Sequence, residues 1–324
     1  MYKKERKAFF NNLDPTFVLD NKMFWKNITA FFSDKRRNNN RIILKDKEGV
    51  ILDEENICEE FNSYFIKATE SLNCDGNSLL INKTSNFDDP IENIIQKFEV
   101  HPSILLIRNK VIEQSDNKFS FCEIRFSEVE KEIGALDPKI GNSSYSIPTK
   151  VLKNCSQSTV SILHNIFNDA LKSGEFPNEL KLANITPIFK KNDHLDKKNY
   201  RPISVLPIVS KLFERLIQNQ INLFIAKFLS PYMCGYRKGF STHQALLSLI
   251  ERWKTSLDNN GYGGAVLMDL SKAFDTINHE LIIAKLHAYG FDKMSLKLLF
   301  SYLTHRFQRT KVNNTFSSWS QLLR

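Results

Sequence analysis

One acidic residue in this sequence follows an apolar segment in a way that suits metal chemistry. The run GGAVLM, residues 263–268, predicts a short buried strand that ends at Asp269 and delivers its carboxylate at the edge of a sheet. Carboxylate oxygens are hard ligands of the kind that Mg²⁺ prefers. An aspartate after a strand also caps the following helix in many α/β proteins, so Asp269 alone leaves both interpretations open.

A basic, strand-forming region precedes this segment. The β-patterned runs ANITPIFKK and YRPISVLP flank the polar turn NDHLDKKN and predict a hairpin-like pair of strands. Lys190 on the first run and Arg201 at the start of the second carry an ammonium and a guanidinium, which suit phosphate oxygens. Lys191 is an alternative to Lys190, because the pattern does not fix the register of adjacent lysines. The other interpretation is that these cations are ordinary solvent-exposed residues of the hairpin and bind no ligand.

The segment GYRKGFSTHQAL combines a basic loop with a helix start at Ser241 or Thr242. Arg237 and Lys238 lie in this loop between glycines, where they are candidates for binding a nucleic-acid backbone. The alternative is a plain loop followed by an N-cap.

The elements that position these residues are mostly helical by their apolar spacing. A long amphipathic helix is expected to end at Gly174, with Ile162, Ile166, Phe167, Ala170 and Leu171 turned inward. Further helices are predicted around residues 53–72, 128–136, 211–225, 242–253 and 279–290.

The charge of the chain is divided unevenly along its length. Residues 151–324 contain 23 lysines and arginines against 12 acidic residues, a net charge of +11, whereas residues 1–150 contain 22 against 24, a net charge of −2. The basic half therefore favours a polyanionic partner, although a basic solvated surface without one is an equal alternative.

Composition excludes several classes of protein. Hydrophobic residues make up 42% and charged residues 25% of the 324, which is ordinary for a globular chain. Five scattered cysteines without a CxxC pair predict neither a disulfide framework nor a zinc knuckle, and fit an intracellular location in the cytoplasm, the nucleus or both. No run approaches the ~20 apolar residues that span a bilayer, so no membrane partner is expected.

Three motifs occur in a fixed order: ITPIFKKNDHLDKKNYRPISVLPIVSKLFERLI, CGYRKGFSTHQALLSLI and GAVLMDLSKAFDTINH. In order and spacing they resemble the reverse transcriptases of jockey-like non-LTR retrotransposons. HPSI at residues 101–104 and the segment FSEVEKEIGALDPKI are similar to the region that precedes the fingers in that family. The resemblance covers roughly residues 100–324. One departure is Cys234, where the family usually has glutamine.

The resemblance implies an RNA-directed DNA polymerase that transfers nucleotides with two Mg²⁺ ions. Asp269 looks like the first metal-binding aspartate, and the backbone carbonyl of Leu270 would add a second oxygen. Phe274 looks like the aromatic gate that lies under the incoming sugar and excludes a 2′-OH.

The basic residues receive roles from the same resemblance. Lys190 and Arg201 look like the finger residues that hold the incoming triphosphate, and Arg237 and Lys238 like contacts to the template strand. The implied partners are an RNA template, a DNA primer or target DNA, and deoxynucleoside triphosphates.

The fold expected from the resemblance is an α+β right-hand polymerase fragment, comprising the fingers and the first part of the palm, with a mostly helical N-terminal extension. We expect the extension over residues 1–100 and the polymerase domain over residues 101–324. The family continues with a Gly-Pro-Gln loop and an Asp-Asp hairpin, whereas this sequence stops at SSWSQLLR, where the loop is expected. The Asp-Asp pair before Pro90 lies on the wrong side of Asp269 to replace that hairpin.

Truncation of the family's domain is the simplest explanation of this pattern, and the chain is then expected to be inactive by itself. Two alternatives remain: a non-catalytic RNA-binding remnant, and a domesticated interaction protein that uses the acidic N-terminal half.

Overall fold

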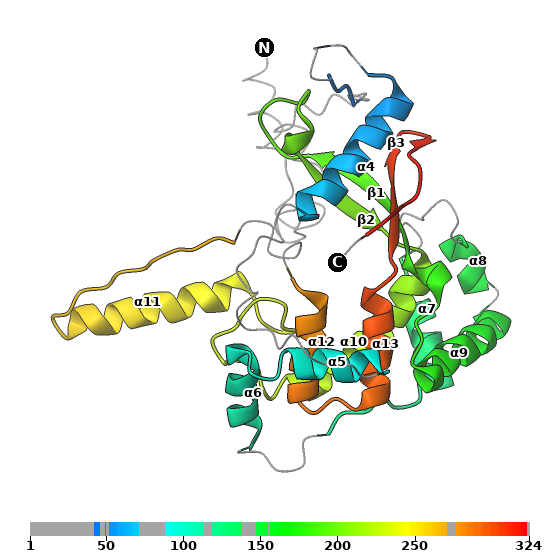
Figure 1. Ribbon diagram of the computed structural model, residues 1–324. Helices are drawn as coiled ribbons and strands as arrows, with labels where there is room; N and C mark the ends of the chain where they lie inside the picture. The colour runs from blue at the N-terminus through cyan, green and yellow to red at the C-terminus, as the bar shows by residue number, and fades with distance from the viewer. Residues whose placement is uncertain are drawn as a thin grey trace, which may run out of the picture.

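The computed structural model describes residues 42–45, 49, 52–70, 88–112, 118–137, 147–154, 156–270 and 277–322. They form a mixed α+β fold in which helices surround a small sheet (Figure 1). None of the helices in these ranges has the length and apolar character needed to cross a bilayer. The helices are α4 (Glu54–Glu70), α5 (Pro90–Lys97), α6 (Pro102–Ile112), α7 (Phe126–Gly134), α8 (Thr149–Asn154), α9 (Ser156–Ser173), α10 (Ile208–Ile225), α11 (Thr242–Asp258), α12 (His279–Ala288) and α13 (Lys293–Leu303).

The sheet is built around the predicted hairpin, which is confirmed. Strand β1 (Leu182–Phe189) pairs antiparallel with β2 (Tyr200–Val205) on one side and parallel with β3 (Phe307–Val312) on the other. Strands β4 (Thr315–Phe316) and β5 (Ser320–Gln321) both pair antiparallel with β3. More than one hundred residues separate β1 from β3 along the chain, so the hairpin is held to the C-terminal part of the fold by strand pairing.

Helix α4 covers one face of this sheet (Figure 1). Its apolar stripe of Ile57, Phe61 and Phe65 is buried, as the predicted helix over this region required. Phe61 meets the ring of Tyr200 from β2 edge-on, with 4.9 Å between ring centroids. Helix α4, which precedes position 100, is therefore part of the sheet layer, and the expected domain boundary at residue 100 stays a prediction.

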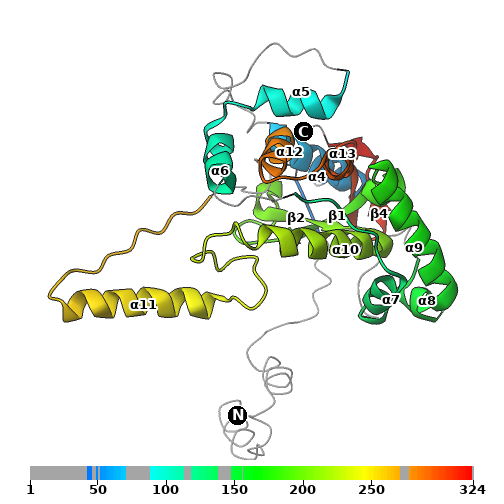
Figure 2. The same cartoon turned by 90° about the horizontal axis from the view of Figure 1, so that it is seen from below.

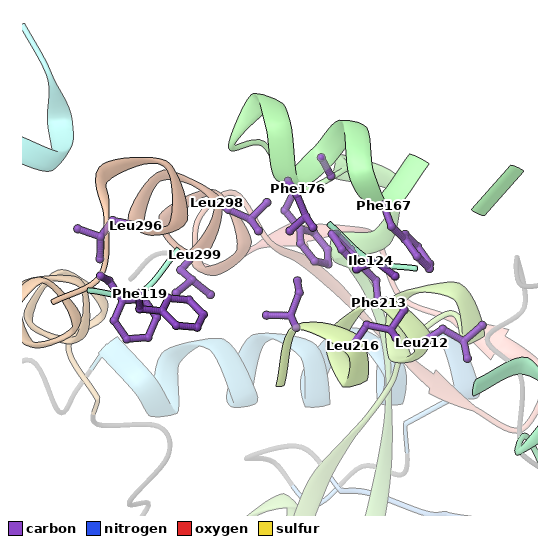
Figure 3. Packing of buried hydrophobic residues seen from close by; sticks show 14 of the residues in the cluster. Phe119, Ile124, Phe167, Phe176, Leu212, Phe213, Leu216, Leu296, Leu298 and Leu299 are labelled. Carbon is purple, nitrogen blue, oxygen red and sulfur yellow. The ribbon is translucent and has the colours of Figure 1, made fainter. Parts of the chain in front are cut away.

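The larger core lies between α9, α10 and α13, below the sheet. Phe213 of α10 is fully buried between two other aromatic rings (Figure 3). Its ring centroid lies 4.6 Å from that of Phe167 and 5.1 Å from that of Phe176, and both ring pairs are stacked. This stack joins α9 and the loop after it to α10, the helix that directly follows the hairpin.

Helix α9 ends at Gly174 as predicted, but the predicted inward face is partly wrong. Gly174 has a φ of +70°, the left-handed conformation that glycine adopts readily after a helix. Ile162 and Ile166 are exposed, at 59% and 40%, whereas Val160 and Leu163 join Phe167 in the core. The actual stripe is rotated relative to the predicted one because α7 and α13 both pack against this helix and choose the buried face.

A buried side-chain amide on α9 fixes the chain segment that leads into α7. Asn168, only 3% exposed, accepts a hydrogen bond from the backbone N–H of Ile124 (2.9 Å) and donates one to its carbonyl (3.0 Å). Asn168→Leu should therefore lower the free energy of unfolding by about 2–4 kcal/mol, since two buried backbone groups lose their partner. Urea denaturation checks this value. Asn165→Leu, at an exposed position of the same helix, should change it by less than about 0.5 kcal/mol; similar losses for the two variants would contradict the argument.

Helix α11 and the segment after it form an arm that points away from the rest of the described chain in both views (Figures 1 and 2). We use "the arm" for residues 242–270. The helix predicted from residue 242 is confirmed, with Ser241 as its N-cap and Gln244 completing a capping box. The helix nevertheless buries none of its residues, and Leu246, Leu247 and Leu257 are each more than half exposed.

The predicted buried strand over residues 263–268 is wrong. These residues form no strand, and Val266, Leu267 and Met268 are each nearly 90% exposed or more. A strand needs a neighbour to accept its hydrogen bonds, and no described residue pairs with this segment. The segment instead runs back beside α11 (Figure 1), so closely that a Cβ on Gly263 would lie 2.7 Å from the indole of Trp253.

Candidate nucleotide and nucleic-acid site

The hairpin presents two different faces. Ala183, Ile185 and Tyr200 point toward α4 and are buried with it in a second apolar cluster. The register pairs Thr186 with Ile203 and Ile188 with Arg201, so these four side chains share the opposite face. We call this opposite side the open face of the hairpin; Ile188 and Ile203 are about half exposed on it.

Lys190 follows β1 directly and extends the open face. Its backbone N–H donates to the carbonyl of Asn199 (2.8 Å), so the pairing of the two chain segments continues past the last strand residue. Side chains alternate along such a segment, and Lys190 is therefore expected on the same side as Ile188 and Arg201. The structure thus places the two predicted phosphate-binding residues on one face, diagonally across the hairpin.

The turn between the strands is rigidly bonded. Tyr200 donates its hydroxyl to the carbonyl of His194 (2.7 Å), and Asn199 donates its amide to the carbonyl of Asp193 (2.8 Å). Lys197 forms an ion pair with Glu60 of α4 and lies over the ring of Tyr64. Burial raises the pKa of the Tyr200 hydroxyl, which remains a neutral donor in this turn.

Three exposed cations lie on the open face or next to it. Lys190, Lys191 and Arg201 are exposed, and none forms an ion pair or side-chain hydrogen bond with the described residues. Lys197 differs, because Glu60 already neutralises it. A guanidinium and an ammonium without partners on a rigid hairpin can bind phosphate oxygens at little cost in reorganisation.

The predicted metal ligands lie on the arm. Asp269 and Leu270 are both exposed at the end of its returning segment, and no ion pair or side-chain hydrogen bond joins them to the hairpin within the described chain. Phe274, the predicted sugar gate, falls outside the described residues, and its role stays a prediction.

The oxygen donors fit Mg²⁺ by type. A carboxylate and a backbone carbonyl are hard ligands, and both are accessible here. In the ranges that the structure describes, no three acidic, histidine or cysteine residues lie close enough together to hold a metal ion. Asp269 and the carbonyl of Leu270 could therefore supply only part of a coordination shell, and their role as metal ligands stays a prediction.

The two predicted template contacts differ in their surroundings. Arg237 donates to the backbone carbonyls of Ser230 (3.0 Å) and Met233 (3.3 Å), and its guanidinium lies 4.2 Å from the ring centroid of Phe240. These contacts close the loop. Lys238 is exposed and has no such partner among the described residues, so its charge is free for a phosphate.

The segment that contains the basic hairpin, the basic loop and Asp269 is similar to known proteins. Residues 188–322 match the family model described as reverse transcriptase (RNA-dependent DNA polymerase). This segment is therefore similar to reverse transcriptases. The match begins inside β1 and includes the open face, the arm and β3, and the recognition made from the sequence motifs is confirmed. The family is one of nucleotidyltransferases.

Relatives from insect retrotransposons share more of the chain. A probable RNA-directed DNA polymerase from transposon BS of Drosophila melanogaster is 31% identical over 197 residues, which is 60% of this chain. The RNA-directed DNA polymerases from mobile element jockey are 27% identical over 165 residues in Drosophila funebris and 25% identical over 212 residues in Drosophila melanogaster, 50% and 63% of this chain. The matched segment is 22%, 18% and 23% of these relatives, so the chain spans about a fifth of their length.

One residue that supports this reverse transcriptase segment was missed by sequence reasoning. Arg309 on β3 donates to the side-chain oxygen of Asn184 on β1 (2.9 Å). Its guanidinium also lies 3.9 Å from the ring centroid of Phe316 and 4.7 Å from that of Trp319. This buried arginine therefore stabilises the pairing of β1 with β3 at the end of the hairpin away from the turn. In the sequence, Arg309 is marked only by its position in the short alternating run of residues 307–312. Its structural role became clear only from the pairing of β1 with β3.

Proposed function

We propose that this chain provides the nucleotide-binding hairpin and the first metal-binding aspartate of a retrotransposon RNA-directed DNA polymerase. The observation that carries the proposal is the open face, where Arg201 and the adjoining Lys190 are exposed and form no ion pair or side-chain hydrogen bond with the described residues, within the segment that matches reverse transcriptases. In this proposal they hold the triphosphate of an incoming deoxynucleotide, and Arg201 uses both arms of its guanidinium. The similarity to RNA-directed DNA polymerases of transposon BS and mobile element jockey supports an RNA template.

In this proposal, the carboxylate of Asp269 and the backbone carbonyl of Leu270 are ligands of Mg²⁺. When bound, two such ions activate the primer hydroxyl and stabilise the charge on the leaving pyrophosphate. This chain's own part is to present oxygens at an exposed position on the arm. Because two-metal sites hold both ions with several carboxylates, we propose that residues 1–324 do not extend a primer alone and act as part of a larger polymerase. We also propose that the protein is intracellular, in the cytoplasm, the nucleus or both.

Arg201→Ala should raise the KM for deoxynucleotides in an active chimera that joins this chain to the downstream part of the transposon BS polymerase. Loss of a charge-assisted hydrogen bond costs about 1.5–3 kcal/mol, or roughly ten- to 150-fold in KM. Steady-state primer extension on an RNA template measures it.

The matched control for Arg201 is Lys172→Ala, which removes an exposed cation from α9, away from the hairpin. Its KM should equal that of the unchanged chimera. If Arg201→Ala leaves the KM unchanged, or the two variants behave alike, the assignment of the open face to the nucleotide is wrong.

RNA binding without catalysis is the second candidate, and the free charge of Lys238 favours it within a half of the chain with net charge +11. The logarithm of the RNA-binding constant should fall against the logarithm of salt concentration by roughly 0.7 per phosphate contact on a single strand. Lys238→Glu should lower that slope by about one contact's worth, roughly 0.7, as measured by fluorescence anisotropy. Lys172→Glu provides the control. A binding constant independent of salt would contradict both this function and a template role for the loop.

A further inference from the structure

A large cavity lies outside the site assigned above. It has a volume of about 1510 Å³ and is formed by the start of α5, the segment between α9 and β1, and α13 with the residues after it. Its wall includes the apolar side chains Phe176, Met294, Phe300 and Phe307. Small-molecule sites commonly measure roughly 300–1,000 Å³, so this space admits an organic ligand with water.

One lysine gives the cavity a charged end. Lys181, the last residue of the short 3₁₀ helix Asn178–Lys181, lines the cavity although it is only 3% exposed to solvent. Its ammonium donates to the hydroxyl oxygen of Ser301 (3.3 Å), which also accepts from the backbone N–H of Phe176 (3.0 Å). No carboxylate of the described residues forms an ion pair with it.

A buried ammonium without a counter-ion is costly, and an apolar side chain of the same length would fill the space at lower cost. Burial lowers the pKa of Lys181, and the nearby Arg306 guanidinium lowers it further, while Glu175 opposes the shift. Since no carboxylate of the described residues forms an ion pair with Lys181, a negative charge placed at this end of the cavity would stabilise the ammonium.

The acidic residues of the cavity wall limit which anionic ligands can bind there. Asp88, Glu175, Glu179 and Asp292 line the cavity, and a polyphosphate or a nucleic-acid strand would meet these carboxylates as well as the cations Lys181 and Lys297. Asp89 and Lys293 neutralise each other across the rim, with 2.6 Å between their charged atoms. A single negative charge on an apolar body satisfies Lys181 and avoids the remaining carboxylates.

We propose that this cavity binds a monocarboxylate with an apolar body, its carboxylate on Lys181 and Ser301 and its apolar part against Phe300 and Phe307. The proposal is independent of the polymerase assignment, because none of these residues belongs to the open face or the arm. The carboxylate replaces the missing counter-ion, and the ligand's hydrocarbon removes apolar wall surface from water.

Calorimetric titration of the full chain with octanoate, octan-1-ol and inorganic phosphate tests the proposal. Octanoate should bind at least about tenfold more tightly than either other probe, because only octanoate has both the charge and the apolar chain. Lys181→Met keeps the length of the side chain and should reduce octanoate affinity to that of octan-1-ol, whereas Lys172→Met should change nothing. Equal affinity for octanoate and octan-1-ol, preference for phosphate, no binding of any probe, or an unaltered preference in Lys181→Met would overturn it.

A second measurement needs no variant and covers the case in which Lys181→Met fails to fold. The charged form of Lys181 holds the carboxylate, so the octanoate-to-octanol affinity ratio should shrink as pH rises from about 7 to about 10. The decline should begin below the range of an ordinary lysine, because the pKa of Lys181 is lowered. A ratio that stays constant across this range would contradict the proposal.

Discussion

Asp269→Asn should abolish template-dependent primer extension by the chimera that joins this chain to the downstream part of the transposon BS polymerase. Asparagine keeps the size of the side chain but removes the charge that a metal ion requires. The expected loss is about a thousandfold in rate or more, ~4 kcal/mol, comparable with the loss of a strong electrostatic contact in an active site. Asp269 is exposed, so the free energy of unfolding should change by less than about 0.5 kcal/mol.

A loss of the primer-extension rate without a change in the free energy of unfolding would show that Asp269 acts in catalysis and not in folding. Asp258→Asn provides the control, because Asp258 is an exposed aspartate at the end of α11, on the same arm. Its rate should match that of the unchanged chimera. Residues 1–324 alone should give no extension with Mg²⁺ and all four deoxynucleotides. An active Asp269→Asn chimera would remove Asp269 from the metal site, and extension by residues 1–324 alone would show that the remaining carboxylates come from elsewhere in this chain or from a second copy.

The sequence predicted best those elements whose signals are local. The hairpin was predictable because two β-patterned runs flank a polar turn; its register puts Ile188 and Arg201 on one face, and the backbone pairing continues to Lys190. One helix begins at Ser241 and another ends at Gly174 where expected, because capping and left-handed conformations depend on neighbouring residues. The family was recognisable for a related reason, since its motifs are continuous in the sequence.

The sequence predicted poorly whatever depends on a distant partner. Residues 263–268 have the composition of a buried strand, yet they are exposed because no described strand lies beside them. Ile162 and Ile166 satisfied helical spacing, but α7 and α13 pack on a neighbouring stripe of α9. Strand β3 was not predicted at all, because Gln308, Arg309 and Thr310 are polar and become buried only through pairing with β1 and its neighbours. Apolar character identifies a candidate core residue, and tertiary contacts decide whether it is buried.

Phe213→Ala should lower the free energy of unfolding by about 3–5 kcal/mol, the range observed for fully buried phenylalanines in protein cores. Phe213 is 0% exposed, and its ring stacks on Phe167 and on Phe176. The two partners belong to α9 and to the loop after it, so neither can follow the truncated side chain without moving its own backbone. The cavity should therefore stay open, and part of the stacking energy, about 0.5–1.5 kcal/mol for each aromatic pair, is lost as well.

Urea denaturation followed by circular dichroism gives the free energy of unfolding of the Phe213 variants. Phe213→Leu should fall between the original protein and Phe213→Ala, because leucine refills part of the volume but cannot stack. Leu223→Ala on the same helix is the matched control: Leu223 is 84% exposed, and its truncation should cost less than about 0.5 kcal/mol. A loss below about 1 kcal/mol for Phe213→Ala would mean that the core collapses around the missing ring.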